Sequence, residues 1–227
     1  SPSSAASDVY KRQLIDKLSA EQLPVATRAL TLKKTRLALK TSGQVNFVCR
    51  VGDYDKAGIE YNGAMRILAN MMNSDYLWNN VRVKGGAYGC GAAFGSFSSS
   101  LGAFSSYRDP NLEKTNEIYD KAPEYVESFN ADEREMTKYV IGTISDLDLP
   151  KTPSVKGSDS FEAYISGLTE QMLQKERDEV LGATVEDIRA LSGMVKAVLD
   201  DGYFCVVGNE DKINEAKDMF DVIEPLA

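Results

Sequence analysis

Apolar positions recur every three or four residues over most of the chain, and this period predicts helices. The strongest such pattern predicts an amphipathic helix from about Ala57 to about Asn80. Its apolar face would consist of Tyr61, Ala64, Met65, Leu68, Met71 and Met72. Further helices are expected over Asn111–Phe129 with an interruption at Pro123, over Ala131–Leu147, from a capping box at Thr184 and Asp187 through Val198, and over Glu210–Phe220.

One more helix is expected after the turn-rich stretch Leu149–Pro153. Residues 156–159 would cap it, and Gly182 would end the region. The helical period assigns its buried stripe to Phe161, Tyr164, Ile165, Leu168 and Met172. Residues 14–39 fit helix and strand about equally, because Pro24 interrupts a helical spacing and short alternations follow.

Strands are predicted in four places. Residues 44–51 form the clearest one, with Val45, Phe47, Cys49 and Val51 on one face of a half-buried strand. Residues 87–94 and 97–107 predict a hairpin joined near Gly95, and residues 203–207 a short buried strand. The sum predicts an α+β fold with a mainly antiparallel sheet and helices packed on one face. Residues 1–13 are expected to be a non-native or disordered tail, and residues 14–227 a single domain.

Composition narrows the chemistry that this chain can perform. It has no histidine, which excludes Ser-His-Asp and Cys-His catalysis and the usual catalytic zinc sets within it. The formal charge of -8 argues against a nucleic-acid partner, because binding the phosphate backbone requires a basic face. The three cysteines show no CxxC spacing, and we expect neither a membrane span nor a secretory signal.

The unusual chemistry lies in residues 82–107, where six glycines fall between Gly85 and Gly102. A phosphate-binding loop is disfavoured, since the required strand, GxGxxG and helix context is missing. Small residues on both predicted strands would leave a flat edge, beside which an extended ligand strand could lie. Neighbouring carboxylates such as Asp146 and Asp148 fit solvated helix faces and turns better than a metal site.

Arg82 and Tyr88 stand at the entrance to this stretch and allow two interpretations. In the structural one, Arg82 stabilises the end of a helix and Tyr88 is half-buried on a strand. In the functional one, the guanidinium binds a peptide carbonyl and the phenol donates to a developing oxyanion. The residue pattern is compatible with both.

Three segments resemble one known family. They are Tyr76-Leu-Trp-Asn-Asn-Val-Arg82-Val-Lys-Gly-Gly-Ala-Tyr88-Gly89, the preceding Val45-Asn-Phe-Val48, and the later stretch from Ile141 to Pro150. Together they resemble the C-terminal domain of presequence proteases, a branch of the pitrilysin/insulinase superfamily of zinc metallopeptidases. The resemblance covers the chain from about residue 40 to its end.

The resemblance implies a zinc endopeptidase whose two halves close around an unfolded peptide, such as a cleaved targeting presequence. The family's zinc motif belongs to the N-terminal half, so zinc is expected there and not in this chain. Arg82 and Tyr88 match the family's substrate-contacting and catalytic pair, with Gly85, Gly86 and Gly89 as part of the same substrate-binding motif. The implied partners are that N-terminal catalytic half and unfolded peptides, and neither nucleic acid nor membrane.

Other functional readings stay open at this point. One is a non-catalytic relative that binds peptides or assembles with other subunits. Another is an α+β domain in which the glycines only allow close sheet packing. The expected location is the bacterial cytoplasm or, in a eukaryote, the mitochondrial or plastid matrix.

Overall fold

The computed structural model describes residues 35–226, together with Val9, residues 12–13 and residues 16–17. Its contacts divide the chain into two units, Ser1–Lys33 and Lys34–Ala227, and the sheet and all helices discussed below belong to the second unit. The tail predicted for residues 1–13 and most of the ambiguous residues 14–39 lie outside the described residues. Both therefore stay predictions.

A six-stranded sheet forms the frame of the second unit, with the strand order β3-β4-β2-β5-β1-β6. Three of the five pairings are antiparallel, namely β2 with β4, β2 with β5 and β3 with β4. The remaining two are parallel and involve β1, which pairs with β5 and β6. The α+β fold and the mainly antiparallel sheet are confirmed. The strands are β1 (Arg36–Thr41), β2 (Asn46–Asp53), β3 (Gly89–Phe94), β4 (Leu101–Asp109), β5 (Tyr203–Asn209) and β6 (Val222–Pro225).

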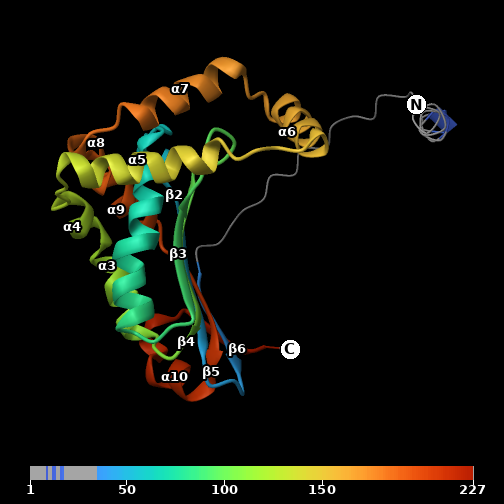
Figure 1. Ribbon diagram of the computed structural model, residues 1–227. Helices are drawn as coiled ribbons and strands as arrows, with labels where there is room; N and C mark the ends of the chain where they lie inside the picture. The colour runs from blue at the N-terminus through green and yellow to red at the C-terminus, as the bar shows by residue number, and fades with distance from the viewer. Residues whose placement is uncertain (1–8, 10–11, 14–15, 18–34, 227) are drawn as a thin grey trace. The chain divides into compact units, whose positions relative to one another are not determined.

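The helices lie mainly over one face of this sheet, as Figure 1 shows for the teal helix and for α3, α4 and α9. The predicted break at Pro123 is confirmed, since α3 and α4 meet there with the proline in the first turn of α4. The helices are α2 (Ala64–Met71), α3 (Glu113–Asp120), α4 (Ala122–Glu127), α5 (Glu133–Leu147), α6 (Pro153–Ser166), α7 (Glu170–Leu181), α8 (Val185–Ala190), α9 (Ser192–Asp200) and α10 (Glu210–Glu215), with short 3-10 turns η1 (Tyr54–Ala57) and η4 (Lys217–Met219).

The long helix that precedes β3 begins later than predicted. It continues from α2 through two π-type segments, η2 (Met72–Tyr76) and η3 (Trp78–Val83), whose hydrogen bonds span five residues instead of four. The Asn62 side chain accepts from the Ala64 amide, so the helix starts at Ala64 and not near Ala57. Five of the six predicted apolar positions are buried in the core, whereas Tyr61 precedes the helix and is only partly buried. The helix therefore delivers residue 82 at its C-terminal end.

The sheet buries the opposite face of β2 from the one that alternation suggested. Val48 is buried against the helices, whereas Phe47 is 40% exposed and Cys49 is only partly covered. Both faces of this strand carry apolar residues, so the pattern alone could not decide which face meets the helices. Residues 47, 49 and 51 lie on the face of the sheet away from the helix layer.

The buried stripe predicted for the helix after Pro153 is wrong. Thr152, rather than residues 156–159, caps α6, and the helix ends at Gly167 so that Met172 belongs to α7. No residue of α6 is buried, and Tyr164 is 85% exposed. The helical period correctly predicted a helix, but it carries no information on whether another element covers the apolar side.

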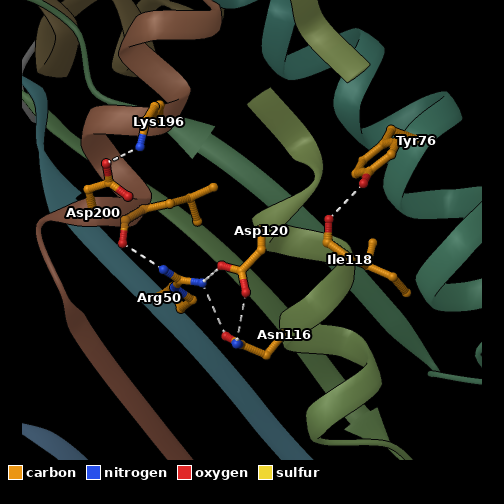
Figure 2. Close-up of polar contacts among 8 residues, drawn as sticks. Arg50, Tyr76, Asn116, Ile118, Asp120, Lys196 and Asp200 are labelled. Atoms are coloured by element: carbon orange, nitrogen blue, oxygen red, sulfur yellow. Dashed lines mark hydrogen bonds and ion pairs between the residues drawn. The ribbon is translucent and has the colours of Figure 1, made fainter. Parts of the chain in front are cut away.

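One arginine joins the sheet to two helices of the layer above it (Figure 2). Arg50 of β2 donates to the side chain of Asn116 in α3 and forms an ion pair with Asp120 of the same helix. Its other terminal nitrogen donates to the Leu199 carbonyl of α9 at 2.6 Å. Tyr76 of the long helix donates to the Ile118 carbonyl of α3 at 2.7 Å. These bonds fix the long helix and α3 relative to the sheet, and so position the residues that follow the long helix.

Candidate functional site

Arg82 lies in the last turn of the long helix, with its side chain exposed between two aromatic rings. Its guanidinium carbon is 4.2 Å from the centre of the Trp78 ring and 5.9 Å from that of the Tyr88 ring. Both distances are in the range where a cation is attracted to the face of an aromatic ring. Within residues 35–226 no carboxylate forms an ion pair with Arg82. The two rings therefore flank an exposed guanidinium.

Two glycines turn the chain back so that Tyr88 returns to Arg82. The Gly86 amide donates to the Arg82 carbonyl at 2.9 Å, and Gly86 has a φ of 82°, which a residue with a side chain adopts only with strain. A Cβ at Gly85 would lie 2.4 Å from the Val81 carbonyl oxygen, which no relaxed structure allows. These glycines are required by the backbone. Gly89, in contrast, has room for a Cβ, whose nearest neighbour would be 3.6 Å away.

Tyr88 stands immediately before β3 and is 66% exposed. Its amide donates to the Tyr107 carbonyl of β4 at 3.1 Å, and its ring meets the Tyr107 ring edge to face at 5.8 Å. Tyr107 in turn contacts Phe47 of β2 at 5.2 Å. We call Trp78, Arg82, Tyr88 and Tyr107 the aromatic–arginine cluster. It presents a guanidinium and a phenol together on the surface.

The pairing register of β4 with β2 helps to position Tyr107 in this cluster. The pairing of β4 with β2 shifts next to Phe47, and Arg108 at this irregularity has a φ of 48°, unusual for an arginine. The shift sets where Tyr107 stands beside Tyr88. Neither Tyr107 nor Trp78 was predicted as a site residue from the sequence. The four-residue spacing of Trp78 and Arg82 on a predicted helix was a usable signal, whereas the role of Tyr107 depends on strand register and gives no local signal.

A groove of about 760 Å³ begins at Trp78 and runs beside β3. We call it the β3 groove. It lies between the long helix, the edge strand β3 and the C-terminal half of α5. Its lining includes Arg66, Asn73, Trp78, Phe94, Asp146 and Leu147.

The described residues do not fit a zinc ion. They contain no group of three histidine, cysteine, aspartate or glutamate side chains that could hold a metal, and the sequence has no histidine. Asp148 is engaged by Arg177, and this ion pair holds the pKa of the carboxyl below its usual range. Cys49 and Cys205 stand opposite each other on β2 and β5 as free thiols, and burial raises the pKa of both.

The fold defines a class of protein. A protease from Helicobacter pylori superposes on 91% of this chain with a TM-score of 0.62 at 15% identity, the match spanning 52% of that protein. A peptidase M16 inactive domain from Pseudomonas fluorescens matches 90% of this chain, and 50% of that one, with a TM-score of 0.59 at 14% identity. The architecture is therefore that of an M16 peptidase-like domain.

The sequence comparisons assign the chain to one branch of that class. The family model described as PreP C-terminal domain matches residues 36–209, so the chain belongs to this family. The protein HypA of Clostridium perfringens is 44% identical over 216 residues, 95% of this chain and 22% of that protein. Presequence protease 1, chloroplastic/mitochondrial, of Arabidopsis thaliana is 34% identical over 203 residues, 87% of this chain. The family resemblance is confirmed, and the chain spans about a fifth of the length of these curated relatives.

Proposed function

We propose that this domain is the substrate-binding C-terminal portion of a zinc metalloendopeptidase that degrades unfolded peptides, including cleaved targeting presequences. The observation that carries the proposal is the exposed guanidinium of Arg82, held between the Trp78 and Tyr88 rings at the start of an edge strand. Family membership supports it, since the Arabidopsis relative is named a presequence protease. In this role Arg82 and Tyr88 bind the substrate carbonyl.

The two side chains would act differently. A guanidinium carries a permanent charge and several donors, so Arg82 binds and orients the carbonyl in the ground state and in the transition state alike. The Tyr88 hydroxyl donates most strongly once negative charge develops on the oxygen, so its effect belongs mainly to the transition state. Gly85 and Gly86 hold the turn that brings these donors together, and Gly89 leaves the start of β3 open to the peptide.

Zinc belongs to a different part of the protein in this proposal. Because the described residues do not fit the ion, the metal would be held by an N-terminal catalytic half, the partner of this domain. The other partner is an unfolded, preferably basic peptide, which suits a chain of net charge -8. No helix in the part of the chain that the structure describes combines the length and apolar character needed to cross a bilayer. The proposed locations are the matrix of mitochondria or plastids, or the bacterial cytoplasm.

Peptide binding by this chain gives the first test. A fluorescently labelled, unstructured peptide rich in arginine, leucine and serine would be titrated with the wild type, with Arg82→Ala and with Arg134→Ala. Arg134 is exposed on α5 and serves as the matched control. Losing charge-assisted donors should weaken binding by about tenfold or more for Arg82→Ala. Equal affinity of all three proteins would contradict the proposal.

Turnover gives the second test, in the holoenzyme that contains the N-terminal half. Tyr88→Phe should lower kcat on the order of 10²- to 10³-fold with little change in KM, the signature of a donor that acts in the transition state. Equal losses in binding and turnover would argue against the oxyanion role. Zinc-dependent cleavage by this chain alone would contradict the proposal that the N-terminal half holds the zinc and this domain only binds the substrate.

A non-catalytic peptide-binding or assembly subunit is the alternative outcome of these tests. The described residues are compatible with it, because they hold no metal-binding group. It would be favoured if Arg82→Ala weakened peptide binding while no neighbouring coding sequence supplied a His-x-x-Glu-His motif with a distal glutamate. Tyr88→Phe would then change affinity only slightly, since no transition state would be stabilised.

A further inference from the structure

The β3 strand is an edge of the sheet, and a side chain hydrogen-bonds the outward amide and carbonyl of one of its residues. The Asn73 side-chain nitrogen donates to the Ala92 carbonyl at 2.9 Å, and the Ala92 amide donates to the Asn73 side-chain oxygen at 2.6 Å. A carboxamide that bonds both groups of one residue reproduces the pair of hydrogen bonds that a neighbouring antiparallel strand makes. Asn73 thus takes the place of one residue of a missing strand.

The remaining outer backbone groups of β3 follow from the strand's alternation. Successive residues direct their amide and carbonyl groups to opposite sides, so Cys90 and Phe94 point the same way as Ala92, away from β4. In agreement, the Gly95 amide points inward and donates to the Leu101 carbonyl at 2.8 Å. Of these residues, Ala92 and Phe94 line the β3 groove, and Cys90 lies on the same edge just before it. An extended segment lying there would find a regular row of donors and acceptors spaced for a strand.

The groove also has a defined side-chain chemistry. Its walls include the apolar surfaces of Trp78, Phe94 and Leu147. Its basic residue, Arg66, is already paired with Glu176 at 2.6 Å, whereas Asp146 is exposed and has no basic partner within residues 35–226. The uncompensated charge in the groove is therefore negative. A peptide with alternating apolar and basic side chains would complement it.

Trp78 connects this groove to the aromatic–arginine cluster. The same indole that lines the groove carries the Arg82 guanidinium on its face, and Tyr88 directly precedes β3. A peptide whose carbonyl is bound by Arg82 and Tyr88 would thus continue along the strand.

We propose that an extended peptide segment carrying a basic side chain binds in the β3 groove as an added strand along Cys90–Phe94 and displaces the Asn73 carboxamide from Ala92. This proposal deepens the proposed function and rests on it, because the same peptide chain would occupy both places. Asn73 then supplies the hydrogen bonds of the outward Ala92 amide and carbonyl while no peptide is bound. It also limits affinity, because each binding event must break its two bonds.

A backbone-methylation scan of the labelled peptide, titrated against the unaltered chain, tests the added strand directly. An N-methyl group removes one backbone donor, and only alternate residues of an added strand point toward β3. Methylation should therefore weaken binding by about tenfold at every second residue and leave the residues between nearly unchanged. A scan without this two-residue period would overturn the proposal, and this result does not depend on whether any variant folds.

Asn73→Ala tests the role of the carboxamide. Removing the competitor should tighten peptide binding by about three- to tenfold, since two hydrogen bonds no longer need to be broken. Asn79→Ala, an exposed asparagine on the same helix outside the groove, should leave affinity unchanged. Ser74→Trp, which fills the groove from an exposed position, should abolish binding. Unchanged or weaker binding by a folded Asn73→Ala protein would contradict the proposal.

The result with Arg82→Ala separates this inference from the proposed function. If Arg82→Ala weakens binding but the methylation scan shows no period, the proposed function stands and the added strand is wrong. If the period is present and Arg82→Ala binds as the wild type does, the groove binds peptide and the role of Arg82 is wrong.

Discussion

Two adjacent glycines at the end of the long helix set the position of Tyr88, and for different physical reasons. Gly86 supplies a positive φ, and Gly85 allows the backbone to approach the Val81 carbonyl. Neither requirement applies to Gly89, although the three residues belong to one sequence motif. A motif thus mixes residues that the backbone needs with residues that leave space for a ligand.

Alanine substitutions should separate these roles. Gly86→Ala should cost about 1 kcal/mol of unfolding free energy from left-handed strain, and Gly85→Ala more than that because of its clash. Gly89→Ala should change stability by less than about 0.5 kcal/mol. Urea unfolding of the three variants measures this order. If the Gly89→Ala protein were less stable than the Gly86→Ala protein, the turn at Gly85 and Gly86 would not be the part of the motif that stabilises the fold.

Tyr76 gives a prediction for alkaline pH. Burial raises its pKa to about 12, and its hydroxyl donates to the Ile118 carbonyl. The folded state therefore retains the proton more tightly than the unfolded state, where a tyrosine titrates near pH ~10. The contribution of this group is complete below about pH 10 and is lost as pH rises toward 12.

Tyr76→Phe should accordingly lower stability by about 1 kcal/mol at neutral pH and make its decline above about pH 10 shallower. Denaturant unfolding at a series of pH values measures both effects. Tyr164→Phe, at an exposed position on α6, is the control and should change neither. A Tyr76→Phe protein with the wild-type alkaline decline would rule out this assignment.

At the scale of elements, helical periodicity predicted where helices form better than it predicted which of their faces are buried. The capping boxes at Asp132 and Thr184 and the break at Pro123 are local signals, and the structure confirms the last two as predicted. Strand β6 was missed, and most of β1 fell in the stretch left open between helix and strand, because each depends on parallel pairing with a distant segment. Such pairing leaves no local trace in a short apolar run.

The α6 helix shows the consequence for stability. Phe161 is 64% exposed and belongs to a helix with no buried residue. Phe161→Ser should therefore change the unfolding free energy of this chain by less than about 0.5 kcal/mol. Met71→Ala, from the buried face of the long helix, should cost about 2–5 kcal/mol. Comparable losses for the two variants, measured by thermal unfolding, would mean that α6 packs against the core in solution.

At the scale of the whole molecule, the sequence predicted the α+β class and the placement of Arg82 and Tyr88 beside an edge hairpin. It did not predict the contact of Tyr107 with Tyr88 or the bonds of Asn73 to Ala92 on the same edge strand, and the spacing of Trp78 and Arg82 was its one local signal. These two contacts depend on a register shift in the pairing of β4 with β2 and on the distance between β3 and the long helix. Each is a property of two elements together, and each was therefore beyond a reading of one segment at a time.

Net charge gives a prediction that belongs to the whole chain. An excess of eight negative charges, with Asp146 in the β3 groove, should attract a basic peptide over a range that salt shortens from about 10 Å at 0.1 M to about 3 Å at 1 M. Affinity for a lysine-rich peptide should therefore fall by about tenfold between about 0.05 M and about 0.5 M sodium chloride. The same peptide with glutamine in place of lysine should vary far less, because its remaining contacts are hydrogen bonds and apolar burial. Asp146→Asn should reduce the salt dependence only in part, since most of the field comes from charges outside the groove. If the lysine and glutamine peptides respond equally to salt, the acidic balance plays no part in choosing the peptide, and selection must come from the groove's shape and the β3 backbone.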